Sequence, residues 1–355
     1  MPGQLKKYAF INAKLRARIS KLLSDEFIDR LVKTHTLVEI MQLLRATYYS
    51  FLDSVYTRTG DIKMCEYEIQ IRELELYSEI ERYVTGEVLH FVVALTTRFE
   101  INNLKNALRL WFERAIRGRN IEEGVGYLYR EKIHYDLKLD RIISSDSLEE
   151  IAYMLNDTPY GRIIRDNAGL VQANKSIFPV EIKLDQYFYD QLTEAAEELK
   201  GRDRDIARRM IGIEIDIQNI SWIIRLKELY GFSLKEAAKN MIPHGYMMTG
   251  EIAESVSDTE NITERLTEIL KKRHSALGAL LGAEQGKGEQ RLELLEHILD
   301  EITQYEVRHI LSGYPFTIGI ILAYFILKEK EMDKIITIIN AKYYNIPPDK
   351  LKEAL

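Results

Sequence analysis

The sequence predicts an all-α protein built from three similar helical domains. Its 355 residues include only 7 prolines and 19 glycines, which favours long helices over a turn-rich β-protein. Apolar residues recur in several segments at the spacing of a helix. In addition, segments far apart in the chain resemble one another at a nearly constant offset, which indicates an internal repeat.

The first repeat match joins the segments that begin at Thr36 and Ser147, an offset of 111 residues. Each segment continues with leucine, then with a glutamate followed by isoleucine, and then with two neighbouring apolar residues. Each ends with a threonine and, two positions later, a tyrosine, at Tyr49 and Tyr160. The same order of residue types at equal spacing indicates two copies of one helical segment.

Two further matches fall at almost the same offset. The second places Glu181 and Asp185 over Glu296 and Asp300, at an offset of 115 residues. The third places Glu100, Asn103 and Arg109 over Asp216, Asn219 and Arg225, at an offset of 116 residues. A weaker copy of the third match begins at Glu331, with Lys334 and Asn340 where the other copies have asparagine and arginine.

Three matches in chain order predict three diverged copies of one unit, which we place at residues 1–119, 120–238 and 239–355. Glycine and proline clusters predict linkers near 118–126 and 237–246. The unit is much longer than the repeats of roughly 34 to 47 residues in helical solenoids. Each copy is therefore expected to be a small helical domain with its own core.

Local spacing predicts helices within these copies. Apolar residues line one face from Ile101 to Trp111 and one face from Ile213 to Ile224. Glu100 precedes the first stripe and Asp216 lies close to the start of the second, so we expect both near helix N-termini, where the helix dipole favours negative charge. The arginines Arg109 and Arg225 then lie nearer the opposite end of each helix.

Composition narrows the possible partners. The formal net charge of −6, with both signs interspersed, disfavours nucleic acid as a partner. A single cysteine, Cys65, excludes an internal disulfide and fits a reducing compartment such as the cytoplasm. The longest apolar stretch, Pro315–Leu327, is shorter than the roughly 20 residues of a membrane-spanning helix. Any membrane association is therefore expected to be indirect, through a protein partner.

The usual signatures of catalysis are missing from the sequence. The segment Gly282–Gly288 resembles a phosphate-binding loop, but its glycine spacing is too short and no serine or threonine follows Lys287. The seven histidines lack metal-ligand spacing, and neither an Asp-Asp pair nor a G-x-S-x-G turn occurs. We therefore expect no catalytic residue, no metal and no cofactor.

Several segments nevertheless point to one known family. Tyr8–Ala17 resembles the Y-x-x-x-N-A-[RK]-[LV]-R-A start of the C subunit of archaeal and bacterial A/V-type ATP synthases, which is related to the d subunit of the vacuolar proton pump. The similarity continues through Phe178–Phe188 and the helices that contain Glu100 and Asp216, and it reaches Lys328–Glu331. The order of these segments and the threefold repeat together are specific to this family.

This resemblance implies a pseudo-threefold, funnel-like arrangement of the three domains. It also implies a non-catalytic central-stalk subunit on the cytoplasmic face of the membrane, which seats the central axle subunits on the proteolipid rotor ring during ATP synthesis or hydrolysis. Such a subunit reaches the membrane only through the ring. The resemblance assigns no binding residue in this sequence, because the family's contacts with the ring are spread over surfaces and do not form a short motif. A generic helical adaptor and an all-α enzyme stay open as alternatives.

Overall fold

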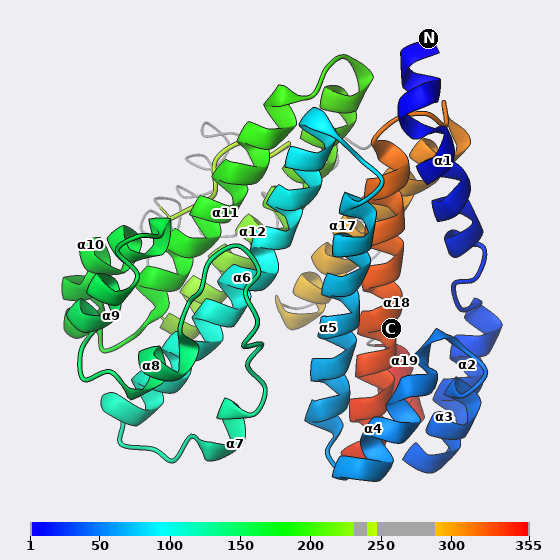
Figure 1. Ribbon diagram of the computed structural model, residues 1–355. Helices are drawn as coiled ribbons and strands as arrows, with labels where there is room; N and C mark the ends of the chain where they lie inside the picture. The colour runs from blue at the N-terminus through cyan, green and yellow to red at the C-terminus, as the bar shows by residue number, and fades with distance from the viewer. Residues whose placement is uncertain (1, 231–239, 247–287, 354–355) are drawn as a thin grey trace. The chain divides into compact units, whose positions relative to one another are not determined.

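The computed structural model describes residues 2–230, 240–246 and 288–353, and every regular element in these ranges is a helix (Figure 1). The prediction of an all-α fold is thus confirmed. Side chains at 2, 123, 220–221, 223–230, 288–299 and 352–353 lie outside the described residues. The same holds for the glycine-rich segment up to residue 287, so its interpretation as a connection stays a prediction.

The helices vary from single turns to rods of 30 residues. In chain order they are α1 (Pro2–Ile19), α2 (Asp25–Lys33), α3 (Leu37–Leu44), the 3₁₀ helix η1 (Tyr48–Ser50), α4 (Phe51–Thr59), α5 (Ile62–Glu81), α6 (Gly86–Ala115), α7 (Glu122–Val125), α8 (Leu139–Ser144), α9 (Leu148–Met154), α10 (Pro159–Asn174), α11 (Phe178–Glu198), α12 (Arg202–Tyr230), α17 (Gly288–Ser312), α18 (Gly319–Tyr343) and α19 (Pro348–Glu353).

Long helices occur in consecutive pairs. The pairs are α5 with α6, α11 with α12, and α17 with α18, and each member has at least 20 residues. Only a few residues connect the two members of each pair. This recurrence agrees with a repeated helical unit, whereas the three predicted domains and their pseudo-threefold funnel stay predictions.

The chain divides into two compact units. The first unit consists of Met1–Thr85, Asn102–Ser145 and Ile320–Leu355, so it combines both ends of the chain. Figure 1 shows α5 and α18 side by side in this unit, where the rings of Tyr77 and Phe325 stack with centroids 3.6 Å apart. Its core therefore draws on segments from opposite ends of the sequence.

The second unit consists of Gly86–Ile101 and Asp146–Gly319. Within it, α10 packs on α9 and α11, and α12 packs on α11 and α17. Phe188 of α11 is 3% exposed, and Trp222 of α12 is 5% exposed. Because each long helix has apolar residues on the face that meets its neighbour, burial of these faces provides most of the driving force for packing.

The first repeat match recurs in the structure as two matching helix starts. Thr36 caps α3 by accepting a hydrogen bond from the Glu39 amide at 3.2 Å, and Ser147 caps α9 by accepting one from the Glu150 amide at 3.2 Å. Each glutamate in turn accepts a bond at 2.9 Å from the amide that precedes the cap. Such reciprocal bonds satisfy backbone donors that a helix N-terminus otherwise leaves without partners.

Two glycines of α10 offer a matched test of its packing on α9. A Cβ added at Gly161 would lie 2.5 Å from the Leu155 carbonyl oxygen and 2.7 Å from that of Ala152, whereas one at Gly169 would meet nothing within 4 Å. We expect Gly161→Ala to lower the free energy of unfolding by about 1–3 kcal/mol through overpacking. Gly169→Ala should raise it by up to about 1 kcal/mol through helix propensity.

Urea unfolding followed by circular dichroism measures both effects. Each substitution adds one methyl group to the same helix, so the difference between the two variants isolates the contact with α9. If both variants were stabilised alike, the close approach of Gly161 to the α9 carbonyl groups would be refuted.

The apolar stretch around Pro315–Leu327 enters α18. Ile318 and Ile321 are both 0% exposed, so the predicted core helix is confirmed there. Across the described residues, no helix combines the length and the apolar character that crossing a membrane requires.

Candidate functional site: buried polar pairs between helices

The two carboxylates of the third repeat match lie buried in the middle of long helices. Glu100 of α6 is 1% exposed and Asp216 of α12 is 0% exposed. The prediction that they stand near helix N-termini is wrong, because α6 begins at Gly86 and α12 begins at Arg202. A buried carboxylate far from a helix end requires hydrogen-bond donors from neighbouring segments.

The asparagines of the same match each bind both backbone groups of one residue. Asn103 donates from Nδ2 to the Tyr129 carbonyl at 2.6 Å and accepts from its amide at 3.0 Å. Asn219 donates to the Ile242 carbonyl at 2.9 Å and accepts from its amide at 2.7 Å. In both cases, an amide side chain fixes a non-helical connection to a long helix and satisfies its backbone polar groups.

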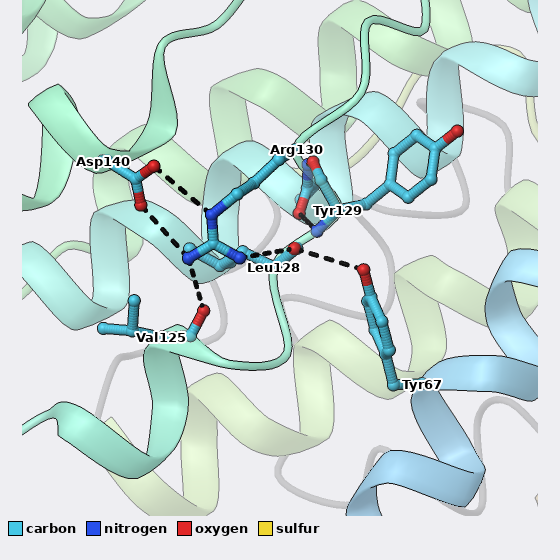
Figure 2. A network of polar contacts seen from close by, with 7 residues as sticks. Tyr67, Val125, Leu128, Tyr129, Arg130 and Asp140 are labelled. Atoms are coloured by element: carbon cyan, nitrogen blue, oxygen red, sulfur yellow. Dashed lines mark hydrogen bonds and ion pairs between the residues drawn. The ribbon is translucent and has the colours of Figure 1, made fainter. Parts of the chain in front are cut away.

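Figure 2 shows how the connection after α6 is held on several sides. The Arg130 guanidinium pairs with both carboxylate oxygens of Asp140, at 3.1 and 3.3 Å, and donates to the Val125 carbonyl at 3.0 Å. The Leu128 carbonyl accepts from Arg130 and from the Tyr67 hydroxyl, each at 3.3 Å. A segment without regular structure is thereby tied to α5 and α8.

Two tyrosine hydroxyls meet two of the predicted carboxylates. Tyr160 donates to Glu100 at 2.7 Å, and Tyr49 donates to Glu331 of α18 at 2.8 Å. Both tyrosines are 0% exposed, and they occupy equivalent positions of the first repeat match. A carboxylate on the second long helix of one pair thus meets the tyrosine of another repeat segment. For Glu331 that segment comes from the opposite end of the chain.

Glu331 is the centre of a buried charged cluster. Its Oε1 lies 2.6 Å from Nζ of Lys328, and its Oε2 accepts a bond from the Leu23 amide. Lys328 donates to the Tyr49 hydroxyl at 3.1 Å, and its ammonium lies 4.0 Å from the ring centroid of Tyr48. Lys328 and Glu331 are only 5% and 7% exposed, so the pair is shielded from water. Both charges are satisfied by several partners, as buried charges require.

The environment of this cluster shifts the acid–base behaviour of its members. Burial lowers the pKa of Lys328, and the neighbouring Glu331 carboxylate opposes this change. Burial raises the pKa of Tyr49 well above its usual value and raises the pKa of Tyr48 to about 12. Both tyrosines therefore keep their protons around neutral pH, and Tyr49 remains a hydrogen-bond donor.

The weaker repeat copy in α18 uses other contacts at the substituted positions. Lys334, where the other copies have asparagine, lies 4.0 Å from the exposed carboxylate of Asp25. Asn340, where the other copies have arginine, donates to Glu66 of α5 at 2.5 Å. Glu331 itself bonds a backbone amide, which is part of what asparagine does in the other two copies. In this copy, the Glu331 carboxylate therefore binds the tyrosine hydroxyl and also a backbone amide.

The arginines of the third match are described at one of their two positions only. Arg109 is exposed and donates to Asn106 of the same helix at 3.2 Å. The side chains of Arg225 and Glu296 lie outside the described residues. Arg109 therefore occupies an exposed position on α6 and contacts its own helix.

The second repeat match falls on two corresponding long helices. Glu181 and Asp185 are half-buried on α11, and Asp300 accepts a bond from Gln304 within α17 at 3.4 Å. Sequence reasoning missed a stronger contact nearby. Asp203, only 1% exposed, accepts the Ile318 amide at 2.9 Å and so anchors the start of α18 to α12.

The arrangement is suited to holding helices together. Glu100, Glu331, Asn103 and Asn219 bond tyrosine hydroxyls, a lysine or backbone groups of other segments, so they are placed to fix geometry. Among the described side chains, no group of three or more His, Cys, Asp or Glu residues is arranged to hold a metal ion. Buried, fully satisfied polar networks make a core rigid and specific.

Comparison with known proteins places the chain in a family. The family model of the ATP synthase (C/AC39) subunit matches residues 11–354. The C subunit of the A-type ATP synthase of Methanocaldococcus jannaschii is 24% identical over 352 residues, which cover 99% of this chain and 86% of that protein. The corresponding C subunits of Methanosphaera stadtmanae and Pyrococcus horikoshii are each 23% identical, over 98% of this chain and 87% and 90% of those proteins.

These matches confirm the resemblance noted in the sequence, and they extend over both compact units. The matched range includes the repeat positions, the buried tyrosines and the cluster around Glu331. The chain therefore belongs to the ATP synthase (C/AC39) subunit family.

Proposed function

We propose that this chain is the non-catalytic central-stalk subunit of a rotary A-type ATP synthase. In this role it seats the axle subunits on the proteolipid ring, and it turns with them during ion-driven ATP synthesis or hydrolysis. The observation that carries the proposal is the family match over residues 11–354, together with relatives that are named as C subunits of A-type ATP synthases.

The internal construction of the chain supports this mechanical role. A protein that couples two parts of a rotor must transmit torque, so its helices should resist bending and sliding. Here buried hydrogen bonds join shorter elements to long helices, from Tyr160 of α10 to Glu100 of α6 and from Tyr49 of η1 to Glu331 of α18. Displacing one helix by a few ångströms would leave these groups without partners, at about 1–3 kcal/mol for each buried group.

The proposed role also specifies partners and location. The chain binds the proteolipid ring on one surface and the axle subunits on another, at the cytoplasmic face of the membrane as a peripheral subunit. It requires neither nucleic acid nor a cofactor. The rotor contacts are expected on exposed surfaces, because the polar pairs described above are occupied within the chain.

Affinity purification from native membranes tests this function. The chain is tagged, mild detergent releases its complexes, and mass spectrometry identifies the proteins that are recovered. We expect the proteolipid and the axle subunits to co-purify with the tagged chain. A tagged, unrelated helical protein expressed at the same level is the control for non-specific recovery.

If neither the proteolipid nor the axle subunits were recovered, the rotor role would be contradicted, and the generic helical adaptor would be the remaining non-catalytic alternative. The all-α enzyme makes the opposite prediction for the isolated chain, because an enzyme of that kind would bind a nucleotide, metal or diphosphate stoichiometrically. Calorimetric titration of the purified chain with these ligands therefore separates the second alternative from the first.

A further inference from the structure

Helix α1 has a charge that differs from that of the rest of the chain. Its 18 residues include five basic residues and no acidic residue, and Lys21 follows shortly after it. The chain as a whole has a formal net charge of −6. The first helix of this compact unit is therefore positively charged, opposite in sign to the chain as a whole.

Only one face of α1 is used for packing. Tyr8, Ile11 and Leu15 are at most 1% exposed and form the inner face. The opposite face is exposed, and we call it the α1 outer face. It consists of Lys6, Ala9, Phe10, Ala13, Arg16 and Ala17. Its centre is thus apolar, and its basic side chains lie near both ends of the helix.

Exposed aromatic and aliphatic side chains accompany these bases. Phe10 is 62% exposed, and its ring lies 5.1 Å from that of Tyr83, which is 36% exposed. Leu5, five residues before Phe10 on the same helix, is 48% exposed. Lys14 donates to the Tyr83 hydroxyl at 2.9 Å and also pairs with Glu79, so the aromatic pair is held at the protein surface.

We propose that the α1 outer face binds the anionic headgroup layer of a lipid bilayer. Interfacial helices combine basic residues with aromatic or aliphatic side chains that enter the boundary between headgroups and acyl chains. The outer face has this combination, with Lys6 and Arg16 for phosphate groups and Phe10 for the apolar boundary. Tyr83 has the amphipathic character of residues that are enriched at membrane interfaces.

A lipid surface fits this face better than an acidic protein surface does. A bilayer is an extended layer of one charge sign over an apolar interior, so it complements a convex helix that has bases and an exposed phenylalanine. A specific protein interface would instead be expected to pair charges of both signs around a packed centre. Lipid binding goes beyond the proposed rotor role, which requires contacts with proteins only.

Vesicle flotation with the full-length chain tests this lipid binding. The probes are vesicles of phosphatidylcholine alone and vesicles in which phosphatidylglycerol replaces about a third of it, at low and at physiological salt. We expect binding only to the anionic vesicles and a decrease with added salt. The variant Lys6→Glu/Arg16→Glu should bind at least about tenfold more weakly, because each basic residue near an anionic surface contributes measurably.

A matched control keeps the same change in net charge at other exposed positions. Arg162→Glu/Arg308→Glu alters side chains that are 86% and 66% exposed, and it should bind like the unaltered chain. Phe10→Ser removes the apolar contribution without changing charge, so it should weaken binding at both salt concentrations. Circular dichroism establishes that each variant is folded.

The proposal is overturned if the unaltered chain does not bind anionic vesicles, or if both charge variants bind equally. It is also overturned if Lys6→Glu/Arg16→Glu binds vesicles normally but no longer co-purifies with ATPase subunits, because the α1 outer face would then bind a protein and not lipid. Because the vesicle assay contains no other subunit, its result is independent of the rotor role.

Discussion

Replacement of Glu331 by alanine is expected to lower the free energy of unfolding by about 3–5 kcal/mol. The carboxylate lies 2.6 Å from the Lys328 ammonium and 2.8 Å from the Tyr49 hydroxyl, at a position that is 7% exposed. Its removal leaves a buried positive charge and a buried hydroxyl without their shared acceptor. The cost of leaving such groups unsatisfied exceeds the cost of the lost contact itself.

Urea unfolding of the full-length chain measures this loss. The matched variant is Lys328→Met/Glu331→Leu, which removes both charges and keeps similar side-chain volumes. It should be more stable than Glu331→Ala, because no uncompensated charge is left in the core. Equal stability of the two variants would show that the charge of Lys328 is solvated and would contradict the buried cluster.

The dependence on pH gives a second measure of the same cluster. Burial lowers the pKa of Lys328 and Glu331 opposes the change, so Glu331→Ala should lower this pKa further. Between the lowered folded pKa and the usual value of 10.5, the unfolded state binds more protons. Stability therefore rises with pH in that window. The deficit of Glu331→Ala should be smaller at about pH 9 than at about pH 7.

The sequence was sufficient to predict the helical class and much of the local structure. Scarce proline and glycine and the one-sided apolar spacing around Trp111 indicated long helices, and Ile101 and Trp111 are indeed buried. The offset between Thr36 and Ser147 located two equivalent segments, and both residues cap helices with the same hydrogen bonds. These features depend on neighbours within a few residues, so a local pattern reveals them.

The partners of the predicted carboxylates could not be obtained from such patterns. The apolar stripe after Glu100 suggests a helix start there, whereas the same helix begins at Gly86 and already has the buried residues Val88 and Phe91 upstream. Tyr49 meets Glu331 across 282 residues of sequence, a contact that depends on how the two ends of the chain pack. The repeat did contain a signal for these tyrosine contacts, because Tyr49 and Tyr160 occupy equivalent positions in its first match.

The asparagines of the third repeat match allow a comparison within one chain. Asn219 is 0% exposed and makes two bonds to the backbone of Ile242, at 2.7 and 2.9 Å. Asn103 makes the same two bonds to Tyr129, but it is only half-buried. The bond pattern is therefore shared, and the two sites differ in their access to water.

We expect Asn219→Ala to lower the free energy of unfolding by about 2–4 kcal/mol, because the Ile242 amide and carbonyl groups would be left buried without partners. Asn103→Ala should cost about 1 kcal/mol or less, since water can reach the Tyr129 backbone and replace the lost bonds. Urea unfolding gives both values, and hydrogen exchange of the Ile242 amide should accelerate in Asn219→Ala. Equal losses of unfolding free energy in the two variants would show that burial does not determine the cost of removing the asparagine. Slow exchange of the Ile242 amide in Asn219→Ala would show that this amide has another acceptor.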